Sequence, residues 1–176
     1  MHGHSNPNNI LLTGRPGCGK STAIERIVQR LDRPSMGFFS REMREGGRRV
    51  GFSITTLDGR RGILAHVDIR SRERVGRYGI NLQHIDEIAV PSIQPEHDNI
   101  VVVVDEIGRM ECFSAMFRKA LVKILDRPNF VLGSIALKGD AFITAIKKRT
   151  DTRLIAVTEK GRDQLAQEIL SGILHG

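Results

Sequence analysis

The stretch "TGRPGCGKST", residues 13–22, decides the fold of this chain. Gly14, four further residues and then Gly19, Lys20 and Ser21 make the spacing of a phosphate-binding loop. Glycines permit backbone turns in which successive N–H groups point inward and form a nest for an anion. Lys20 then brings a positive charge to the β- and γ-phosphates, and the Ser21 hydroxyl is the expected ligand of Mg²⁺. The loop predicts phosphate binding but does not yet specify a reaction.

The residues on both sides of this loop support the same interpretation. Ile10, Leu11 and Leu12 form a short apolar run typical of a buried strand. Apolar residues at helical spacing follow the loop, and they are Ala23, Ile24, Ile27, Val28 and Leu31. A strand, a glycine loop and a helix in this order are the context that the motif requires. Cys18 occupies a variable place in the loop, where we expect a small packing residue rather than a redox centre.

Length and composition predict one domain with a sizeable core over residues 10–176. Residues 1–9, "MHGHSNPNN", are expected to form a flexible lead-in in which His2 and His4 are solvated. No apolar stretch reaches 18 residues, so we expect no membrane span. The 2 cysteines lie far apart, which favours free thiols in the reducing cytoplasm.

The chain carries a net charge of +7, and its arginines concentrate between residues 41 and 77. A basic surface by itself supports nonspecific attraction to polyanions such as nucleic acid. Aromatic residues that stack on bases are scarce in this segment. A nucleoside triphosphate is itself a polyanion, so nucleic acid is possible but less favoured as the ligand.

The rest of the pattern predicts an α/β fold. Short extended segments at 37–41, 48–56 and 62–67 are separated by turn residues, which indicates an antiparallel hairpin insertion after the first helix. Leu82 to Ala89 predicts a short helix that ends at Pro91. Strands are then expected at 100–104, 130–137 and 153–157, and helices at 113–125, 140–148 and 165–174. Continuous apolar strands that alternate with helices predict a mainly parallel sheet with helices on both faces, as in P-loop NTPases.

A second phosphate-site element is "VVVVDEIGRME", residues 101–111. A buried strand is expected to end at Asp105, whose carboxylate is suited to hold Mg²⁺ directly or through water. Glu106 follows immediately and is suited to orient and deprotonate a water in line with the γ-phosphate. Glu111 is a second candidate for that role, unless it lies in the first turn of the next helix, where a negative charge suits the helix dipole.

With both elements in place, the chain resembles the small nucleoside-triphosphatase family of thermophilic prokaryotes, known in animals as cancer-related nucleoside-triphosphatase. The stretches that carry the resemblance are "TGRPGCGKST", "GFFSREMREGGRRVGF", "RVGRYGINL", "IAVP" and "VVVVDEIGRMECFS". The resemblance implies Mg²⁺-dependent hydrolysis of nucleoside triphosphates (ATP, GTP, CTP and UTP) to diphosphates with broad base tolerance. It also implies nucleotide contacts from Arg15, Pro16, Gly17, Cys18, Gly19, Lys20, Ser21 and Thr22.

Three positions depart from the family pattern. Family members commonly have two acids before Arg44, whereas here Arg41 precedes the single acid Glu42. Arg109 stands where the family often has lysine, and Gly161 stands where it tends to have asparagine. If the loop around Gly161 touches the base, base preference is expected to differ, while the phosphate chemistry is unaffected.

The sequence therefore predicts an NTPase in which Lys20, Asp105 and Glu106 are catalytic and Ser21 and Asp105 hold the metal. An arginine is expected to balance the charge of the transition state. The candidates for it are Arg44, Arg49 and Arg109. Two alternatives stay open on the residues alone, because a nucleotide or small-molecule kinase and a nucleic-acid-associated ATPase module share every phosphate-binding element.

Overall fold

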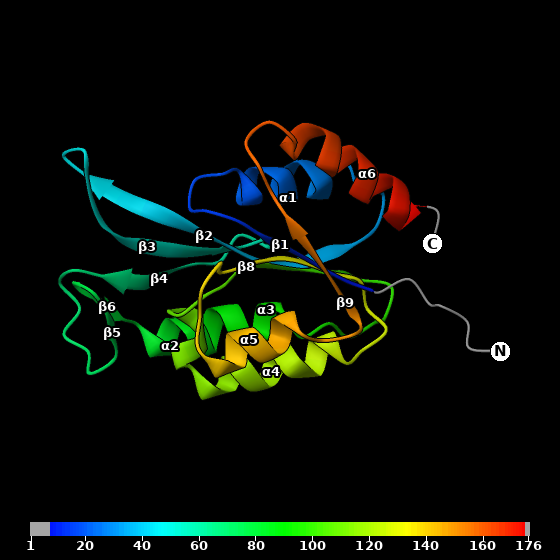
Figure 1. Ribbon diagram of the computed structural model, residues 1–176. Helices are drawn as coiled ribbons and strands as arrows, with labels where there is room; N and C mark the ends of the chain where they lie inside the picture. Colours follow the sequence, from blue (N-terminus) through cyan, green and yellow to red (C-terminus); the bar gives the residue numbers. More distant parts are fainter. Residues whose placement is uncertain (1–7, 175–176) are drawn as a thin grey trace.

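The computed structural model describes residues 8–174, which form one mixed sheet of nine strands with helices on both faces (Figure 1). The strands lie in the order β5-β6-β4-β3-β2-β7-β8-β1-β9. Their bounds are β1 (Asn9–Thr13), β2 (Ser35–Glu45), β3 (Arg48–Thr56), β4 (Arg61–His66), β5 (Arg74–Val75), β6 (Tyr78–Ile80), β7 (Val101–Ile107), β8 (Val131–Ile135) and β9 (Thr152–Ala156).

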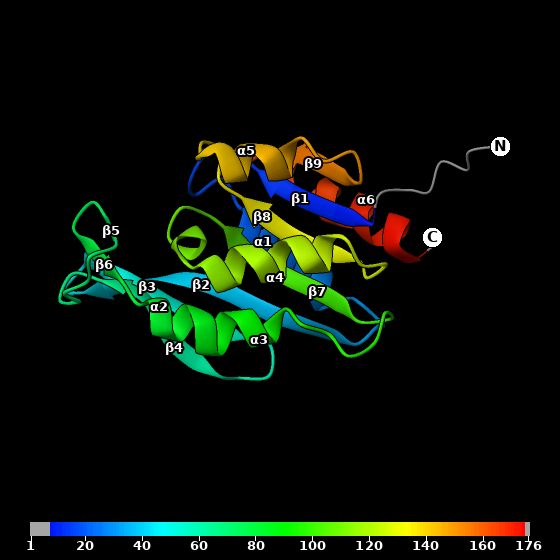
Figure 2. The same ribbon diagram turned by 90° about the horizontal axis from the view of Figure 1, so that it is seen from below.

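The helices divide between the two faces of the sheet. Helices α1 (Lys20–Val28) and α6 (Arg162–Leu174) lie together on one face (Figure 1). The opposite face, seen in Figure 2, carries α2 (Leu82–His84), the π-helix η1 (Ile85–Ala89), α3 (Val90–Ser92), the 3₁₀ turn η2 (Glu111–Phe113), α4 (Ala115–Leu125) and α5 (Ala141–Lys147). None of the helices within residues 8–174 is long and apolar enough to cross a membrane.

The parallel part of the sheet confirms the predicted α/β class. Strands β2, β7, β8, β1 and β9 pair in parallel, and β8 lies between β1 and β7. Val101, Val102, Val103 and Val104 of β7 are fully buried because helices cover both of its sides. The carboxyl ends of β1 and β7 therefore lie at the same edge with one strand between them, which brings the phosphate loop close to Asp105.

The antiparallel hairpin follows α1 as predicted, and its first strand also belongs to the parallel core. The first half of β2 pairs with β7 from Ser35 to Phe39, and the second half runs on as a hairpin with β3. Gly37 permits the close approach of β2 to β7, since a Cβ at this position would lie 1.9 Å from the carbonyl oxygen of Val103. The hairpin therefore extends beyond the carboxyl edge of the sheet as a continuation of a core strand (Figure 1).

Two details differ from the sequence expectations. Strands β5 and β6, which add two more antiparallel members beside β4, were not predicted. The helix at residues 82–92 does not end before Pro91, because α3 follows the π-helix η1 without a break and carries the helix one residue past this proline.

The amino-terminal boundary lies one residue earlier than expected, because β1 begins at Asn9. The Asn9 side chain is buried and donates to the carbonyl oxygen of Leu125 at 3.0 Å, and Asn8 donates to that of Pro128 at 3.1 Å. Residues 1–7, with His2 and His4, lie outside the described residues.

Candidate active site

The phosphate loop connects β1 to α1 and has the backbone that its glycines predict. Gly14, Gly17 and Gly19 all have positive φ, at 152°, 78° and 101°. A Cβ at Gly14 would lie 2.8 Å from the Cys18 sulfur and 2.9 Å from the carbonyl oxygen of Val157. Cys18 itself is buried in the core between the sheet and helices α1 and α6, so it is a packing residue as expected.

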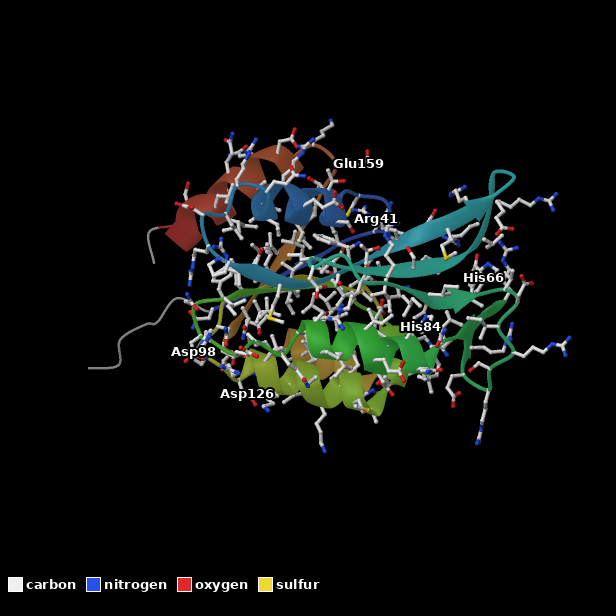
Figure 3. The ribbon with its side chains drawn as sticks, turned by 180° about the vertical axis from the view of Figure 1, so that it is seen from behind. Arg41, His66, His84, Asp98, Asp126 and Glu159 are labelled. Atoms are coloured by element: carbon white, nitrogen blue, oxygen red, sulfur yellow. The ribbon has the colours of Figure 1, made fainter. Side chains whose placement is uncertain are left out.

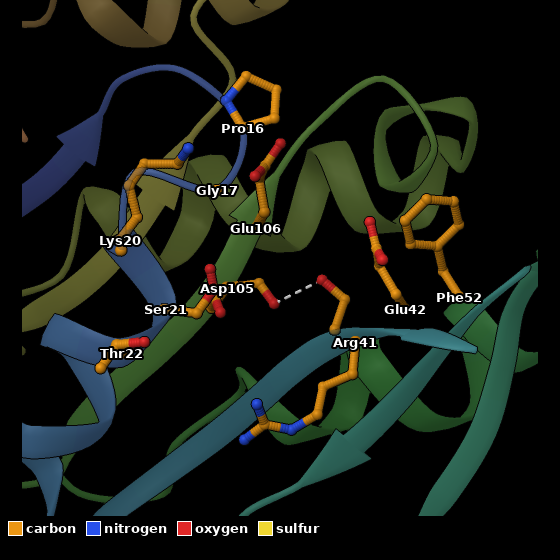
Figure 4. Close-up of a pocket in the computed structure, with 12 residues that line it drawn as sticks. Pro16, Gly17, Lys20, Ser21, Thr22, Arg41, Glu42, Phe52, Asp105 and Glu106 are labelled. Atoms are coloured by element: carbon orange, nitrogen blue, oxygen red, sulfur yellow. Dashed lines mark hydrogen bonds between the residues drawn. The ribbon is translucent and has the colours of Figure 1, made fainter. Parts of the chain in front are cut away.

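Lys20 is the first residue of α1, and its side chain folds back into the loop. Its Nζ donates to the carbonyl oxygens of Gly14 at 3.1 Å and of Arg15 at 3.3 Å. The side chain is buried, and its charge partly offsets the rise that burial causes in the pKa values of Asp105 and Glu106. The ammonium group is therefore held against the loop, and Figure 4 shows the side chain curling back toward Gly17 beside Glu106.

Asp105 lies on β7 with its carboxyl group almost completely buried. The Ser134 hydroxyl donates to its Oδ1. The Ser40 hydroxyl donates to its main-chain oxygen at 2.8 Å, the bond drawn as a dashed line in Figure 4. Burial raises the pKa of Asp105, whereas the hydrogen bond from Ser134, the nearby Ser21 hydroxyl and the charge of Lys20 oppose the rise. The Oδ2 atom is buried without a hydrogen-bond partner in the described structure.

This unpartnered oxygen is the test of whether the residues fit a metal ion. Buried carboxylate oxygens ordinarily find a donor or a cation, and an Asp oxygen beside a serine hydroxyl suits a hard divalent cation such as Mg²⁺. No three His, Cys, Asp or Glu side chains gather into a metal site within residues 8–174. Ser21 and Asp105 therefore fit an ion whose other ligands are phosphate oxygens and water.

Glu106 follows Asp105 and lines the pocket, whereas Glu111 lies fully buried behind it. Burial raises the pKa of Glu106, with Lys20 opposing the shift and Asp105 adding to it. Burial and the neighbouring charge of Glu106 raise the pKa of Glu111 to about 8. The two carboxyl groups converge on Gly108, where a Cβ would lie 2.9 Å from Glu111 Oε2 and 3.0 Å from Glu106 Oε1.

These groups surround a pocket of about 330 Å³ at the carboxyl edge of the sheet (Figure 4). Its lining residues are Pro16, Gly17, Gly19, Lys20, Ser21, Thr22, Ser40, Arg41, Glu42, Phe52, Asp105 and Glu106. Six of the eight loop residues predicted to contact nucleotide line the pocket. Of the other two, Arg15 is exposed and Cys18 points into the core.

Five further residues line or support the site, and no sequence pattern predicts a role for them: Ser40, Arg41, Glu42, Phe52 and Ser134. Ser134 lies on β8 beside β7, near the carboxyl edge where ligands bind. A serine near the end of a predicted parallel strand is the one sequence feature that could have indicated a role in the site. The other four come from β2 and β3, and no local pattern places a hairpin against the phosphate loop.

The structure also separates the three candidate arginines. Glu42 accepts hydrogen bonds from Arg44 at 2.9 and 3.1 Å and from Arg49 at 2.8 Å, and these bonds lower its pKa. Glu42 lines the pocket, so both arginines are connected to the pocket wall by their hydrogen bonds to this carboxylate. Arg109 is exposed and lines a different hollow with Phe113, Arg118, Lys138, Gly139 and Asp140.

Comparison with known proteins gives a consistent result. Residues 9–170 match the NTPase family. Nucleoside-triphosphatase THEP1 of Thermotoga maritima is 45% identical to this chain, and the match covers 92% of this chain and 93% of that protein. The human cancer-related nucleoside-triphosphatase is 36% identical, with 93% and 95% covered.

Solved structures agree with the sequence comparisons. The crystal structure of THEP1 from Aquifex aeolicus superposes with a TM-score of 0.83 at 34% identity, covering 93% of this chain and 97% of that one. The solution structure of the human cancer-related nucleoside triphosphatase gives a TM-score of 0.79 at 35% identity, covering 94% and 96%. The likeness therefore includes the parallel sheet and the hairpin end together.

Proposed function

Since the chain belongs to the NTPase family and is a nucleoside-triphosphatase, we propose that it hydrolyses nucleoside triphosphates to diphosphate and phosphate with Mg²⁺ and with broad base tolerance. The observation that carries the proposal is the buried, unpartnered Oδ2 of Asp105 beside Ser21 and opposite Lys20. It explains why an acid is kept at the floor of a phosphate pocket, where a cation is needed to offset the charge of the triphosphate.

In this proposal the loop residues bind the triphosphate. The backbone N–H groups of residues 15–22 and the ammonium group of Lys20 contact the phosphates. Ser21 and Asp105 hold Mg²⁺, which when bound neutralises charge on the phosphate oxygens. Ser134 fixes the orientation of the Asp105 carboxylate by donating to Oδ1, which leaves Oδ2 for the ion.

Glu106 is the group that we assign to water activation. A water oxygen forms a bond to the γ-phosphorus while the bond between the γ-phosphorus and the β,γ-bridging oxygen breaks. The electron pair of the broken bond stays on the bridging oxygen, which leaves with the diphosphate. Glu106 orients the water and accepts its proton. Its side chain lines the pocket, so it has the access to water that this role requires.

Glu111 is the weaker candidate for the same role for two reasons. Its side chain does not line the pocket, and its pKa of about 8 keeps it protonated at neutral pH. A protonated carboxyl group has no free charge with which to take a proton from water. We assign it instead to holding the loop at Gly108, because its carboxyl group accepts hydrogen bonds from the backbone N–H groups of Gly108 and of Glu111 itself.

Among the arginines, Arg49 is the best placed to balance the charge of the transition state. Its guanidinium group stacks 5.3 Å from the centroid of Phe52, which lines the pocket, and its ion pair with Glu42 ends at the pocket wall. Arg44 shares Glu42 but is more exposed, and Arg109 lies in the other hollow.

Base tolerance follows from the kind of contacts that the site offers. Every group assigned above contacts phosphate, metal or water, which all nucleoside triphosphates share. The test is phosphate release from ATP, GTP, CTP and UTP in Mg²⁺ and in EDTA, without any acceptor. We expect all four to be hydrolysed within about a hundredfold of one another and EDTA to abolish the release. Full activity in EDTA would contradict the metal assignment, and a larger base preference would reveal a base-reading contact.

We further propose a cytoplasmic location. Both cysteines, Cys18 and Cys112, are buried as free thiols, which is the state that a reducing compartment maintains. Fractionation of cells that express a tagged chain would check this, and recovery with secreted or membrane material would contradict it.

A further inference from the structure

We propose that the end of the molecule beyond the phosphate pocket binds single-stranded nucleic acid. The surface is made by the tip of the β2–β3 hairpin and the segment from β4 to β6, which lie at the same end of the sheet (Figure 1). We call it the arginine rim, and its members are Arg44, Arg48, Arg49, Arg70, Arg72, Arg74 and Arg77. This inference does not depend on which residue activates water.

The net positive charge of the chain is concentrated in this region. Residues 41–77 contain ten arginines and five acidic residues, so they carry five of the seven units of net charge. Figure 3 shows long side chains with nitrogen tips extending into solvent at this end, near the labelled His66. A one-signed surface of this kind attracts polyanions and contacts their phosphates.

Two arginines of the rim have a structural task. Arg77 donates to the main-chain oxygen of Arg49, which ties the β5–β6 segment to the hairpin. Arg74 donates to the main-chain oxygens of Ile69 at 3.2 Å and of Arg77 at 2.6 Å. The two tips are therefore held together as one surface.

Three other arginines of the rim have no such task. Arg48, Arg70 and Arg72 are exposed, and their side chains make no hydrogen bond or ion pair within the described part of the chain. Cations that neither pair with an acid nor hold the fold are available to phosphates of a partner.

Aromatic residues beneath the rim fix the guanidinium planes in place. Arg49 lies 5.3 Å from the ring centroid of Phe52 and 5.7 Å from that of Tyr78, and Arg77 lies 5.2 Å from that of Tyr78. The Tyr78 hydroxyl accepts from Arg49 at 3.0 Å and from Arg77 at 3.2 Å. Fixed guanidinium planes are surfaces on which unpaired bases stack, which favours single strands over duplexes.

The stack also joins the rim to the phosphate pocket, because Phe52 lines the pocket and packs edge-to-face against Tyr78 with ring centroids 5.4 Å apart. A strand bound along the rim would therefore pass close to the nucleotide.

An anionic membrane is the other polyanion to consider, and the distribution of apolar side chains argues against it. Membrane surfaces are usually gripped by apolar side chains beside the basic ones. The exposed large apolar residues of the described chain are Met116, Leu137 and Leu154, and they lie on α4, after β8 and on β9. The rim has none of them.

The test is fluorescence anisotropy with a labelled 20-nucleotide oligouridine, titrated at several salt concentrations. The test variant combines Arg48→Glu, Arg70→Glu and Arg72→Glu. The matched control combines Arg30→Glu, Lys119→Glu and Lys123→Glu, which changes the net charge equally at exposed residues of α4 and of the turn after α1. Neither set includes a group assigned to the hydrolytic site, so phosphate release should stay near the wild-type rate for both.

We expect the wild type to bind, the test variant to bind at least tenfold more weakly, and the control to change little. The slope of log K against log salt should flatten by about 2 in the test variant, since each contact to a single strand contributes about 0.7. Equal losses in both variants would overturn the location, and absence of wild-type binding would overturn the proposal. Binding to phosphatidylserine vesicles but not to oligouridine would also overturn it, in favour of a membrane. Melting curves confirm that both variants are folded.

Discussion

The pocket has two walls that are built in opposite ways. The wall made by the phosphate loop and β7 holds a few charged groups, of which Lys20 and Asp105 are almost inaccessible to solvent. The wall made by the hairpin holds exposed charges that neutralise one another, as Glu42 does with Arg44 and Arg49. One wall therefore keeps its charged groups buried, and the other keeps paired charges exposed to water.

The difference indicates where the chemistry takes place. A charge in a buried site acts with far more energy than the same charge in water, because the surroundings screen it less. Exposed ion pairs contribute little, typically below about 1 kcal/mol. Substitutions in the loop wall should therefore change turnover greatly, whereas substitutions in the hairpin wall should change it slightly and act on what binds beside the nucleotide.

The largest effect is expected for Lys20→Ala. It removes the only buried ammonium group whose charge acts on Asp105 and Glu106 within the described residues, so binding and turnover should fall roughly a thousandfold. Phosphate release and equilibrium binding of a nonhydrolysable analogue measure the two losses. Lys138→Ala, at an exposed position outside this pocket, is the control and should keep its activity. Wild-type turnover in Lys20→Ala would break the assignment of the loop wall.

Glu106→Gln should separate binding from hydrolysis. Glutamine keeps the size and still orients a water, but it takes no proton, so turnover should fall by roughly a hundredfold. Affinity should stay nearly unchanged because Lys20, Ser21 and Asp105 remain. Single-turnover hydrolysis measured beside equilibrium binding checks both expectations. A large loss of turnover in Glu111→Gln, with little loss in Glu106→Gln, would show that Glu111 and not Glu106 is the general base.

Glu111→Gln is expected to act on stability rather than on turnover. Its folded-state pKa of about 8 lies above the ordinary value of 4.5, so the unfolded chain loses this proton at lower pH than the folded chain. Ionisation of Glu111 therefore leaves the free energy of unfolding unchanged below pH 4.5. It lowers that free energy increasingly as the pH rises, and the loss is complete above pH 8. The variant should gain up to about 3 kcal/mol over the wild type by pH 7. Denaturant titrations from pH 4.5 to 8.5 would show it, and a parallel pH dependence of both proteins would contradict it.

The loop wall could be predicted from the sequence because its chemistry is local. The spacing from Gly14 to Ser21 specifies a turn, a cation and a hydroxyl within one stretch, and the structure puts Lys20, Ser21 and Asp105 at one edge. The parallel sheet was predictable as well, since strands such as Val101–Val104 are apolar without alternation.

The hairpin wall could not be predicted in the same way. Arg41 and Glu42 are adjacent in the chain but make different contacts, because Arg41 pairs with Glu25 of α1 at 2.5 Å and Glu42 pairs with the hairpin arginines. Those contacts depend on the path of β2 from the core to the hairpin and on its register shift after Met43. The burial of Glu111 could not be predicted from the sequence either. Glu106 and Glu111 are both candidate bases on the residues alone, but only Glu106 lines the pocket.

The smallest effect, and the sharpest test of the contrast between the walls, is expected for the hairpin arginines. Arg49→Ala should lower turnover by about tenfold, or 1.4 kcal/mol, because Arg49 stacks on a pocket residue but remains partly exposed and paired with Glu42. Arg44→Ala should change turnover less, because its pair with Glu42 is more exposed. Arg109→Ala, in the other hollow, serves as the control and should match the wild type.

The measurement is kcat for phosphate release at saturating nucleotide, with Arg49→Lys included to separate charge from planar stacking. A loss of a thousandfold or more in Arg49→Ala would mean that Arg49 leaves Glu42 and meets the γ-phosphate in the transition state, as an arginine finger does. The two walls would then form one catalytic unit, and the matched charges of the hairpin would be a resting arrangement that nucleotide binding opens. A loss of kcat near tenfold in Arg49→Ala, with kcat recovered in Arg49→Lys, would mean that the two walls act separately. An exposed charge that acts at a distance does not require the planar guanidinium group of arginine, so lysine can replace it.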